Sequence, residues 1–171
     1  MAKSNYILFS LWLILFLSPK NLDSSCITDV ADSQIGVREI GENGGWRVGQ
    51  YQKSTGNKQG DSWCSSFVHW CYLQCGKTIP TNGGAYSNLN YKHLVYFNNK
   101  FKESPIPGDI FTIYSISQKR IHHTGFYRDK YNDKMYYTVE GNTNTNGSSN
   151  GIGVFKRIRS YNTTYSISRF D

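Results

Sequence analysis

The chain lacks an apolar run long enough to cross a membrane as a helix. Its longest run, residues 6–17, has 12 residues, whereas a spanning helix needs about 20. The run follows one cation, Lys3, and ends before Ser18 and Pro19. A charged start, a short apolar centre and a polar exit are typical of a secretory signal. We therefore expect residues 1–25 to be a signal peptide, with a retained membrane anchor as the alternative.

Acidic residues are also scarce, with 12 Asp and Glu against 19 Lys and Arg. Loss of residues 1–25 would lower the formal net charge only from +7 to +6, because two lysines leave with one aspartate. A basic exported protein is drawn to anionic polymers such as wall glycan or phosphate-rich surfaces. The cations are scattered, and only Lys156, Arg157 and Arg159 lie close together. We interpret that cluster as a solvated strand face and expect no nucleic-acid partner.

Internal repeats are absent, and residues 26–171 are enough for one domain but leave no room for a second. We expect this domain to be a monomer in the periplasm or outside the cell. Cys26 follows the small residue Ser25 just beyond the apolar run, so lipidation of Cys26 is an alternative to ordinary cleavage near residue 25. A lipidated Cys26 would then be the protein's only membrane contact.

The four cysteines contain no Cys-x-x-Cys pair, the spacing typical of zinc sites. We therefore expect no metal. An exported protein meets an oxidising space, which favours disulfides. If Cys64 stays free, Cys71 and Cys75 are one helical turn apart and poorly placed for a mutual bridge. Cys26 is then expected to pair with Cys75 or Cys71.

Hydrophobic periodicity predicts helices in the first half of the chain and strands in the second. The expected helices cover residues 29–40, 46–53 and 63–75, and the expected strands cover residues 109–114, 122–128, 135–142, 152–159 and 165–170. Residues 131–134 suit a hairpin turn, and residues 77–104 suit a loop with at most one short helix within 86–97. Helices followed by strands predict an α+β domain, with N-terminal helices packed on a C-terminal antiparallel sheet.

Cys64 is the best candidate for a nucleophile. It stands in the first turn of the expected helix 63–75, which Asp61 or Ser62 can cap and Gly76 can end. Unpaired amides in a first turn stabilise a thiolate, and the same amides can bind the oxyanion formed when the thiolate attacks a carbonyl. Cys71 lies further along the same helix, where a buried cysteine behaves as a small hydrophobic residue.

A base for this thiol must be one of four histidines. His69 follows Cys64 by five positions on the same helix, about 140° round from it, and so points elsewhere. His93 lies in a loop-like region. His122 and His123 are adjacent on an expected strand, so alternation sends them to opposite faces and only one can reach the thiol.

The next expected strand carries polar side chains that can orient an imidazole. Thr138, Glu140 and Asn142 share one face if strand alternation holds. A carboxylate and a carboxamide beside a histidine would hold its orientation and tautomer. Without further information, a solvated strand end for Glu140 and a turn for Asn142 are equally good interpretations.

Four motifs occur in an informative order, namely Trp63-Cys64-Ser65-Ser66-Phe67-Val68, Pro107-Gly108-Asp109-Ile110, His123-Thr124-Gly125-Phe126 and Val139-Glu140-Gly141-Asn142-Thr143. In this the chain resembles the CHAP family of cysteine, histidine-dependent amidohydrolases and peptidases, over about residues 29–160. The resemblance implies Cys64 as nucleophile, His123 as base, Glu140 as its orienting partner and Asn142 as a supporting polar residue. His123 is selected over His122 because the family histidine stands two positions before a glycine.

The resemblance further implies a papain-like fold and an attack on bacterial peptidoglycan without a cofactor. The bond cut would be either the amide between muramic acid and the stem peptide or a peptide bond of the stem or cross-bridge. Gly125 would leave room for substrate or for Cys64. Two alternatives are a secreted cysteine protease or transpeptidase acting on proteins, for which Asn146 and Asn162 would be glycosylation sites, and a wall-binding module without turnover.

Overall fold

The computed structural model describes residues 19–145 and 151–170. In these residues three α-helices precede seven strands, and every strand pairing is antiparallel, which confirms the expected α+β class with an antiparallel sheet. The helices are α1 (Pro19–Ser33), α2 (Trp46–Ser54) and α3 (Cys64–Gln74). The strands are β1 (Leu94–Phe97), β2 (Lys100–Phe101), β3 (Ile110–Ser115), β4 (Arg120–Lys130), β5 (Met135–Thr143), β6 (Gly153–Ser160) and β7 (Ser166–Ser168).

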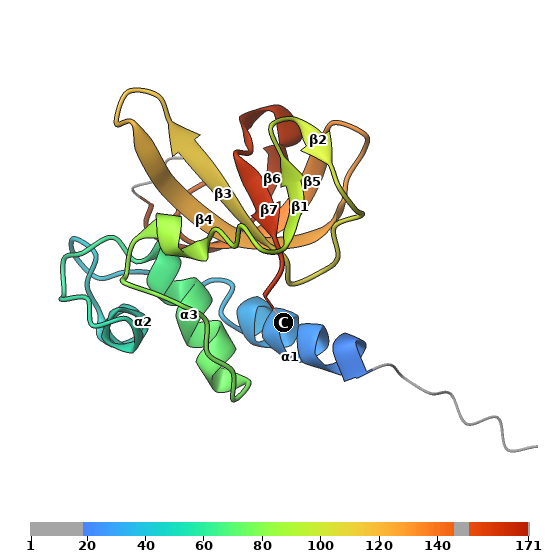
Figure 1. Cartoon of the computed structure of the whole chain (residues 1–171). Coiled ribbons are helices and arrows are strands. Elements are labelled where there is room, and N and C mark those ends of the chain that lie inside the picture. The colour runs from blue at the N-terminus through green and yellow to red at the C-terminus, as the bar shows by residue number, and fades with distance from the viewer. Residues whose placement is uncertain (1–18, 146–150, 171) are drawn as a thin grey trace, which may run out of the picture.

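The strands form one sheet in the order β2-β1-β7-β3-β4-β5-β6, and two short 3₁₀ helices, η1 (Ala85–Asn88) and η2 (Tyr161–Thr163), complete the fold. Figure 1 shows the sheet on one side and the three α-helices gathered on the other. Helix α3 contacts strands β4 and β5. Helix α3, which begins at Cys64, therefore lies beside the two strands that carry the expected base and its partner.

Strand alternation divides the interior into two hydrophobic clusters. One lies between helices and sheet and includes Phe67 of α3 together with Ile110 and Phe126 of the sheet. The other includes Phe111 and Tyr127, the next residue along each of those two strands. The period of two in the sequence thus buries both faces of the central strands.

The first helix differs from the sequence-based prediction. Helix α1 spans Pro19–Ser33 rather than residues 29–40, so it crosses the expected cleavage position near residue 25. It ends in a turn at residues 34–36, where Gly36 has a φ of 93°, a backbone conformation that favours glycine. Most of the expected signal peptide, residues 1–18, lies outside the described residues. No helix in the described part of the chain has the length and hydropathy needed to cross a bilayer.

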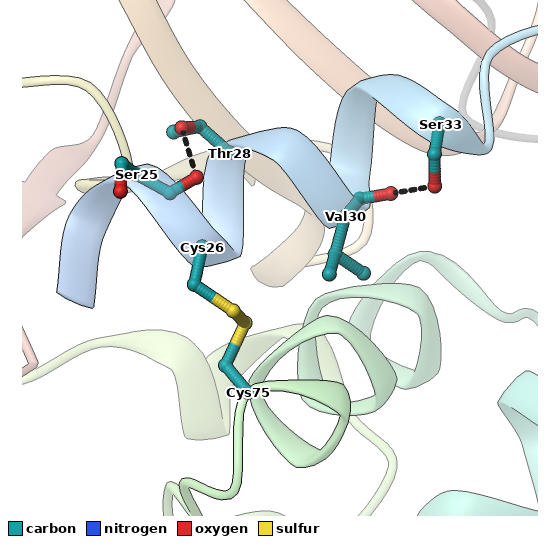
Figure 2. Close-up of a disulfide and its surroundings, with 6 residues drawn as sticks. All are labelled: Ser25, Cys26, Thr28, Val30, Ser33 and Cys75. Atoms are coloured by element: carbon teal, nitrogen blue, oxygen red, sulfur yellow. Dashed lines mark hydrogen bonds between the residues drawn. A yellow bond between two sulfur atoms is a disulfide. The ribbon is translucent and has the colours of Figure 1, made fainter. Parts of the chain in front are cut away.

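A disulfide joins Cys26 of α1 to Cys75, the residue that follows α3. This is one of the two pairings expected from the sequence. Figure 2 shows the bridge between Cys26 on α1 and Cys75 at the end of α3. A sulfur bonded in a disulfide cannot also carry a lipid thioether, so this structure and lipidation of Cys26 exclude each other.

Candidate active site

Cys64 is the first residue of α3, and Trp63 is its N-cap. Trp63 rather than Asp61 or Ser62 occupies the N-cap, and no side-chain capping hydrogen bond is found there among the described residues, so the expected capping by Asp61 or Ser62 is wrong. The carboxylate of Asp61 instead accepts the amide N–H of Lys58 at 2.7 Å. The first-turn amides of a helix have no intrahelical acceptor, which leaves the partial positive charge of the helix end next to the thiol of Cys64.

Trp63 anchors the start of this helix. Its side chain is fully buried and stacks on Tyr51, with the ring centroids 5.5 Å apart. Its indole Nε1 donates a hydrogen bond to Glu39 Oε2 at 3.3 Å. Trp63 is thus held both through its ring face and through its indole N–H. Because Cys64 directly follows Trp63, these contacts also fix the position of Cys64 at the start of α3.

The structure brings His123 of β4 to Glu140 of β5. His123 Nε2 and Glu140 Oε2 are 2.8 Å apart, and the two side chains are 1% and 0% exposed. The other ring nitrogen, Nδ1, is buried and has no partner with full hydrogen-bond geometry among the described residues. The thiol of Cys64, itself 4% exposed, nevertheless lies close enough to stabilise the charged imidazole. Three of the four predicted site residues are thus brought together.

The protonation states of this pair are set by competition between burial and specific partners. Burial lowers the pKa of His123, but its interactions with the nearby Cys64 thiol and with the hydrogen-bonded, charged Glu140 outweigh burial and raise the pKa to about 9. Burial likewise acts to raise the pKa of Glu140, but hydrogen bonds from Arg159 and His123 hold it well below its usual range. An imidazolium beside a carboxylate is therefore the favoured state near neutral pH.

Arg159 of β6 is a site residue that the sequence interpretation missed. Its Nε donates to Glu140 Oε1 at 2.7 Å and its Nη2 to Glu140 Oε2 at 2.5 Å, which makes a bidentate pair. Thr138 Oγ1 donates to the same carboxylate at 2.6 Å. The interpretation of Arg159 as part of a solvated strand face is therefore wrong, because its side chain is only 13% exposed.

Two glycines allow the elements of the site to approach closely. A Cβ on Gly141 would lie 2.6 Å from Phe67 Cβ, so the absence of a side chain lets β5 pack directly on α3. A Cβ on Gly125 would lie 2.9 Å from Glu140 Cγ and from a ring carbon of Phe111. The space above Gly125 is thus occupied by Glu140 and Phe111, which corrects the expectation that substrate or Cys64 uses it.

Asn142 does not continue the face of Glu140 as simple alternation predicts. The pairing of β5 with β6 shifts between Glu140 and Thr143, and Asn142 has a φ of 52°. Such a bulge redirects side chains. The Oδ1 of Asn142 accepts the N–H of Gly151 at 3.2 Å, while its Nδ2 is buried without a partner among the described residues. Its contact in the structure is with the returning chain rather than with His123.

Strict alternation also fails at His122. The register pairs Ile113 with His123 and Tyr114 with Ile121, so His122 is the extra residue of a bulge. The choice of His123 as the base therefore rests on its contact with Glu140 and not on alternation.

The other histidines have different surroundings. Burial is the largest cause of the lowered pKa of His122, and His69 likewise has a lowered pKa because it is buried. His93 pairs with Glu103 through a 2.7 Å contact of its Nε2.

A buried polar network connects α3, η1 and β4 next to the site. Asn88 of η1 donates from Nδ2 to Ser65 Oγ at 3.1 Å and to Thr124 Oγ1 at 3.5 Å. Ser65 follows the candidate nucleophile, and Thr124 follows the candidate base. Asn88 therefore connects the two elements on which the Cys64 and His123 geometry depends. The sequence predicted a loop with at most one short helix in this region and assigned no role to Asn88.

No group of three or more His, Cys, Asp or Glu side chains that could hold a metal ion occurs within residues 19–145 and 151–170. No protein-family model matches the chain, and no match is found among curated proteins or solved structures. The functional interpretation therefore depends on the geometry of the site and on the sequence motifs.

Proposed function

We propose that this protein is a cysteine hydrolase in which Cys64 is the nucleophile, His123 the base and Glu140 the residue that orients His123. The observation that carries the proposal is the meeting of three elements. The thiol at the start of α3 lies next to an imidazole on β4, whose far nitrogen is 2.8 Å from a buried carboxylate on β5. This is the arrangement of nucleophile, base and orienting group that acyl transfer requires.

The proposed mechanism uses these groups in two steps. The Cys64 thiolate attacks the substrate carbonyl carbon, and the first-turn amides of α3 hydrogen-bond the resulting oxyanion. The C–N bond then breaks as the His123 imidazolium gives its proton to the leaving amine. In the second step His123 takes a proton from water, the hydroxide attacks the thioester carbonyl, and the carboxylic acid and free Cys64 are released.

The substrate class is proposed as the amide or peptide bonds of bacterial peptidoglycan. The motifs around Cys64, His123 and Glu140 resemble those of CHAP enzymes, and the same resemblance favours a papain-like arrangement of α3 against the sheet. The formal charge, +7 for the whole chain and +6 without residues 1–25, favours a polyanionic substrate environment. The expected signal peptide would deliver the enzyme to the wall.

The test is digestion of purified peptidoglycan with mass analysis of the released fragments. Wild-type protein is expected to release fragments with new amine and carboxyl ends, whereas Cys64→Ala releases none. The identity of the new ends distinguishes the muramoyl amide from stem or cross-bridge peptide bonds. Lys156→Met, a change at an exposed position on β6, is the matched control and should retain hydrolysis.

Two outcomes would favour the alternatives. Cleavage of casein without cleavage of peptidoglycan would move the assignment to a protease acting on proteins. Binding to peptidoglycan without release of any fragment, while a thiol probe labels Cys64 stoichiometrically, would indicate a binding module that keeps the fold without turnover.

A further inference from the structure

Arg159 reaches the candidate active site from the edge strand of the sheet. It lies on β6, the last strand of the sheet order, and its guanidinium reaches inward to Glu140 on β5. Lys156 and Ile158 on the same strand are exposed. The arginine is therefore directed to the interior, although a neighbouring isoleucine remains at the surface.

The hydrogen bonds between Arg159 and Glu140 include one to the same carboxylate oxygen that faces His123. Glu140 Oε2 accepts from Arg159 Nη2 and is also the oxygen 2.8 Å from His123 Nε2. The second oxygen, Oε1, is held by Arg159 Nε and by Thr138. Rotation of the carboxylate away from His123 would break both bonds of a bidentate pair, so Arg159 fixes which oxygen faces the base.

Charge balance gives the arginine a second effect. A reactive Cys64 thiolate beside a His123 imidazolium adds no net charge to the site, and Arg159 with Glu140 adds none either. Without the arginine, the thiolate form would leave one uncompensated negative charge among buried groups, which is costly. The site would then favour a protonated Cys64.

We propose that Arg159 is a positioning residue that holds Glu140 against His123 and, by balancing its charge, favours the thiolate of Cys64. This inference rests on the proposed cysteine chemistry but not on the identity of the substrate. It concerns the ionisation of the nucleophile, which can be measured without peptidoglycan.

The other titratable groups near the site do not supply the same charge. His122 lies beside His123, and burial is the main cause of its lowered pKa, so it is neutral near pH 7. Tyr136 of β5 has a pKa raised by burial and also stays neutral. Glu39 hydrogen-bonds Trp63 at the start of α3 and is an acid. Among these neighbours, Arg159 is the permanent cation next to Glu140.

The experiment measures alkylation of Cys64 by iodoacetamide from about pH 4 to about pH 9, where the thiolate sulfur bonds the methylene carbon and iodide leaves. Peptide mass analysis assigns the label to Cys64 rather than Cys71. Arg159→Met is expected to move the acidic limb of the rate profile upward by about one pH unit or more. Arg159→Lys keeps the charge but loses the bidentate contact, and should shift the acidic limb less. Lys156→Met removes a cation from the same strand and should not shift it.

An unchanged acidic limb in folded Arg159→Met, or an equal shift in Lys156→Met, would overturn the inference. Circular dichroism establishes folding. If Arg159→Met does not fold, Arg159→Lys supplies the test, because an unshifted alkylation profile in that folded variant would contradict the positioning role of the bidentate contact. The outcome is separate from that of the peptidoglycan assay. A shifted profile in a protein that does not cleave peptidoglycan would reject the proposed substrate and leave the role of Arg159 intact.

Discussion

Cys64 and Cys71 are both buried free thiols on α3, yet their replacement is expected to have opposite effects. Cys64→Ala removes the sulfur that lies beside His123, so it should abolish hydrolysis while leaving the fold intact. Cys71 is packed in the core between helices and sheet, and burial raises the pKa of its thiol. Cys71→Ala should keep hydrolysis and lower the free energy of unfolding by about 1 kcal/mol. Hydrolysis assays and urea denaturation of both variants make the comparison. Activity in Cys64→Ala would disprove the assignment of the nucleophile.

The adjacent histidines give a second comparison at the residue scale. His123 lies 2.8 Å from Glu140, whereas His122 is the extra residue of a bulge and has a lowered pKa, with burial as the largest cause. His123→Ala should lower the steady-state rate by about 100-fold or more, the effect of losing a general base. His122→Ala should retain most of the activity. Circular dichroism of both variants serves as the folding control, and an inactive folded His122→Ala beside an active His123→Ala would reverse the assignment.

At the scale of elements, the disulfide is expected to stabilise the pairing of α1 with α3. Cys26 and Cys75 are separated by 49 positions, so the bridge restricts a long loop of the unfolded chain. For a loop of that length the chain-entropy model gives a stabilisation of up to about 4 kcal/mol. The double variant Cys26→Ser and Cys75→Ser should lower the free energy of unfolding, measured in urea, by up to about 4 kcal/mol.

The same double variant separates stability from chemistry. Cys64 lies at the opposite end of α3 from the bridge, and its first-turn amides do not depend on the disulfide. The alkylation rate of Cys64 should therefore stay near the wild-type value under conditions where the variant is folded. A large loss of Cys64 reactivity with unchanged stability would contradict this division of roles.

Elements with a clear period were predictable from the sequence. Helices α2 and α3 begin and end within a residue of their predicted bounds, and the strands β3 to β6 within about two, because apolar residues recur there at helical or strand spacing. Strands β1 and β2 were missed, since they are short and surrounded by polar residues. Asn98 and Asn99 between them have φ of 51° and 59°, and such an Asn pair is typical of a tight hairpin turn. The Asn98-Asn99 pair was therefore the sequence signal that could have predicted the β1–β2 hairpin.

At the scale of the whole molecule, the candidate site was only partly predictable. Cys64, His123 and Glu140 were proposed from motifs, and the structure brings them together. Arg159 is also part of this cluster, but it was not proposed from the sequence. The sequence of β6 places Ile158 between two arginines, which ordinarily buries the isoleucine and exposes the arginines. The reverse occurs, with Ile158 43% exposed and Arg159 turned toward Glu140. A buried carboxylate on a neighbouring strand decides this orientation, and that is a tertiary effect.

The charges of the site should also be visible in the pH dependence of stability of the whole protein. The pKa of His123 is raised to about 9 because its interactions with Cys64 and Glu140 outweigh burial. Its contribution is therefore fully present below its unfolded value, about 6.5, and is lost as the pH rises through about 9. The pKa of Glu140 is depressed, so its contribution is present above about 4.5 and is lost only as the pH falls through its lower folded value. Both contributions are complete between about pH 4.5 and about pH 6.5.

The histidines with lowered pKa, His69 and His122, act in the opposite direction, because they destabilise the fold as the pH falls below about 6.5. A comparison with His123→Gln removes their effect, since they are present in both proteins. The difference in the free energy of unfolding between wild type and His123→Gln should shrink by about 1–3 kcal/mol as the pH rises from about 6.5 to above about 9. Urea denaturation at a series of pH values measures it. A difference that stays constant or grows over this range would mean that His123 is not held as an imidazolium by Glu140, and the proposed thiolate–imidazolium pair would lose its physical basis.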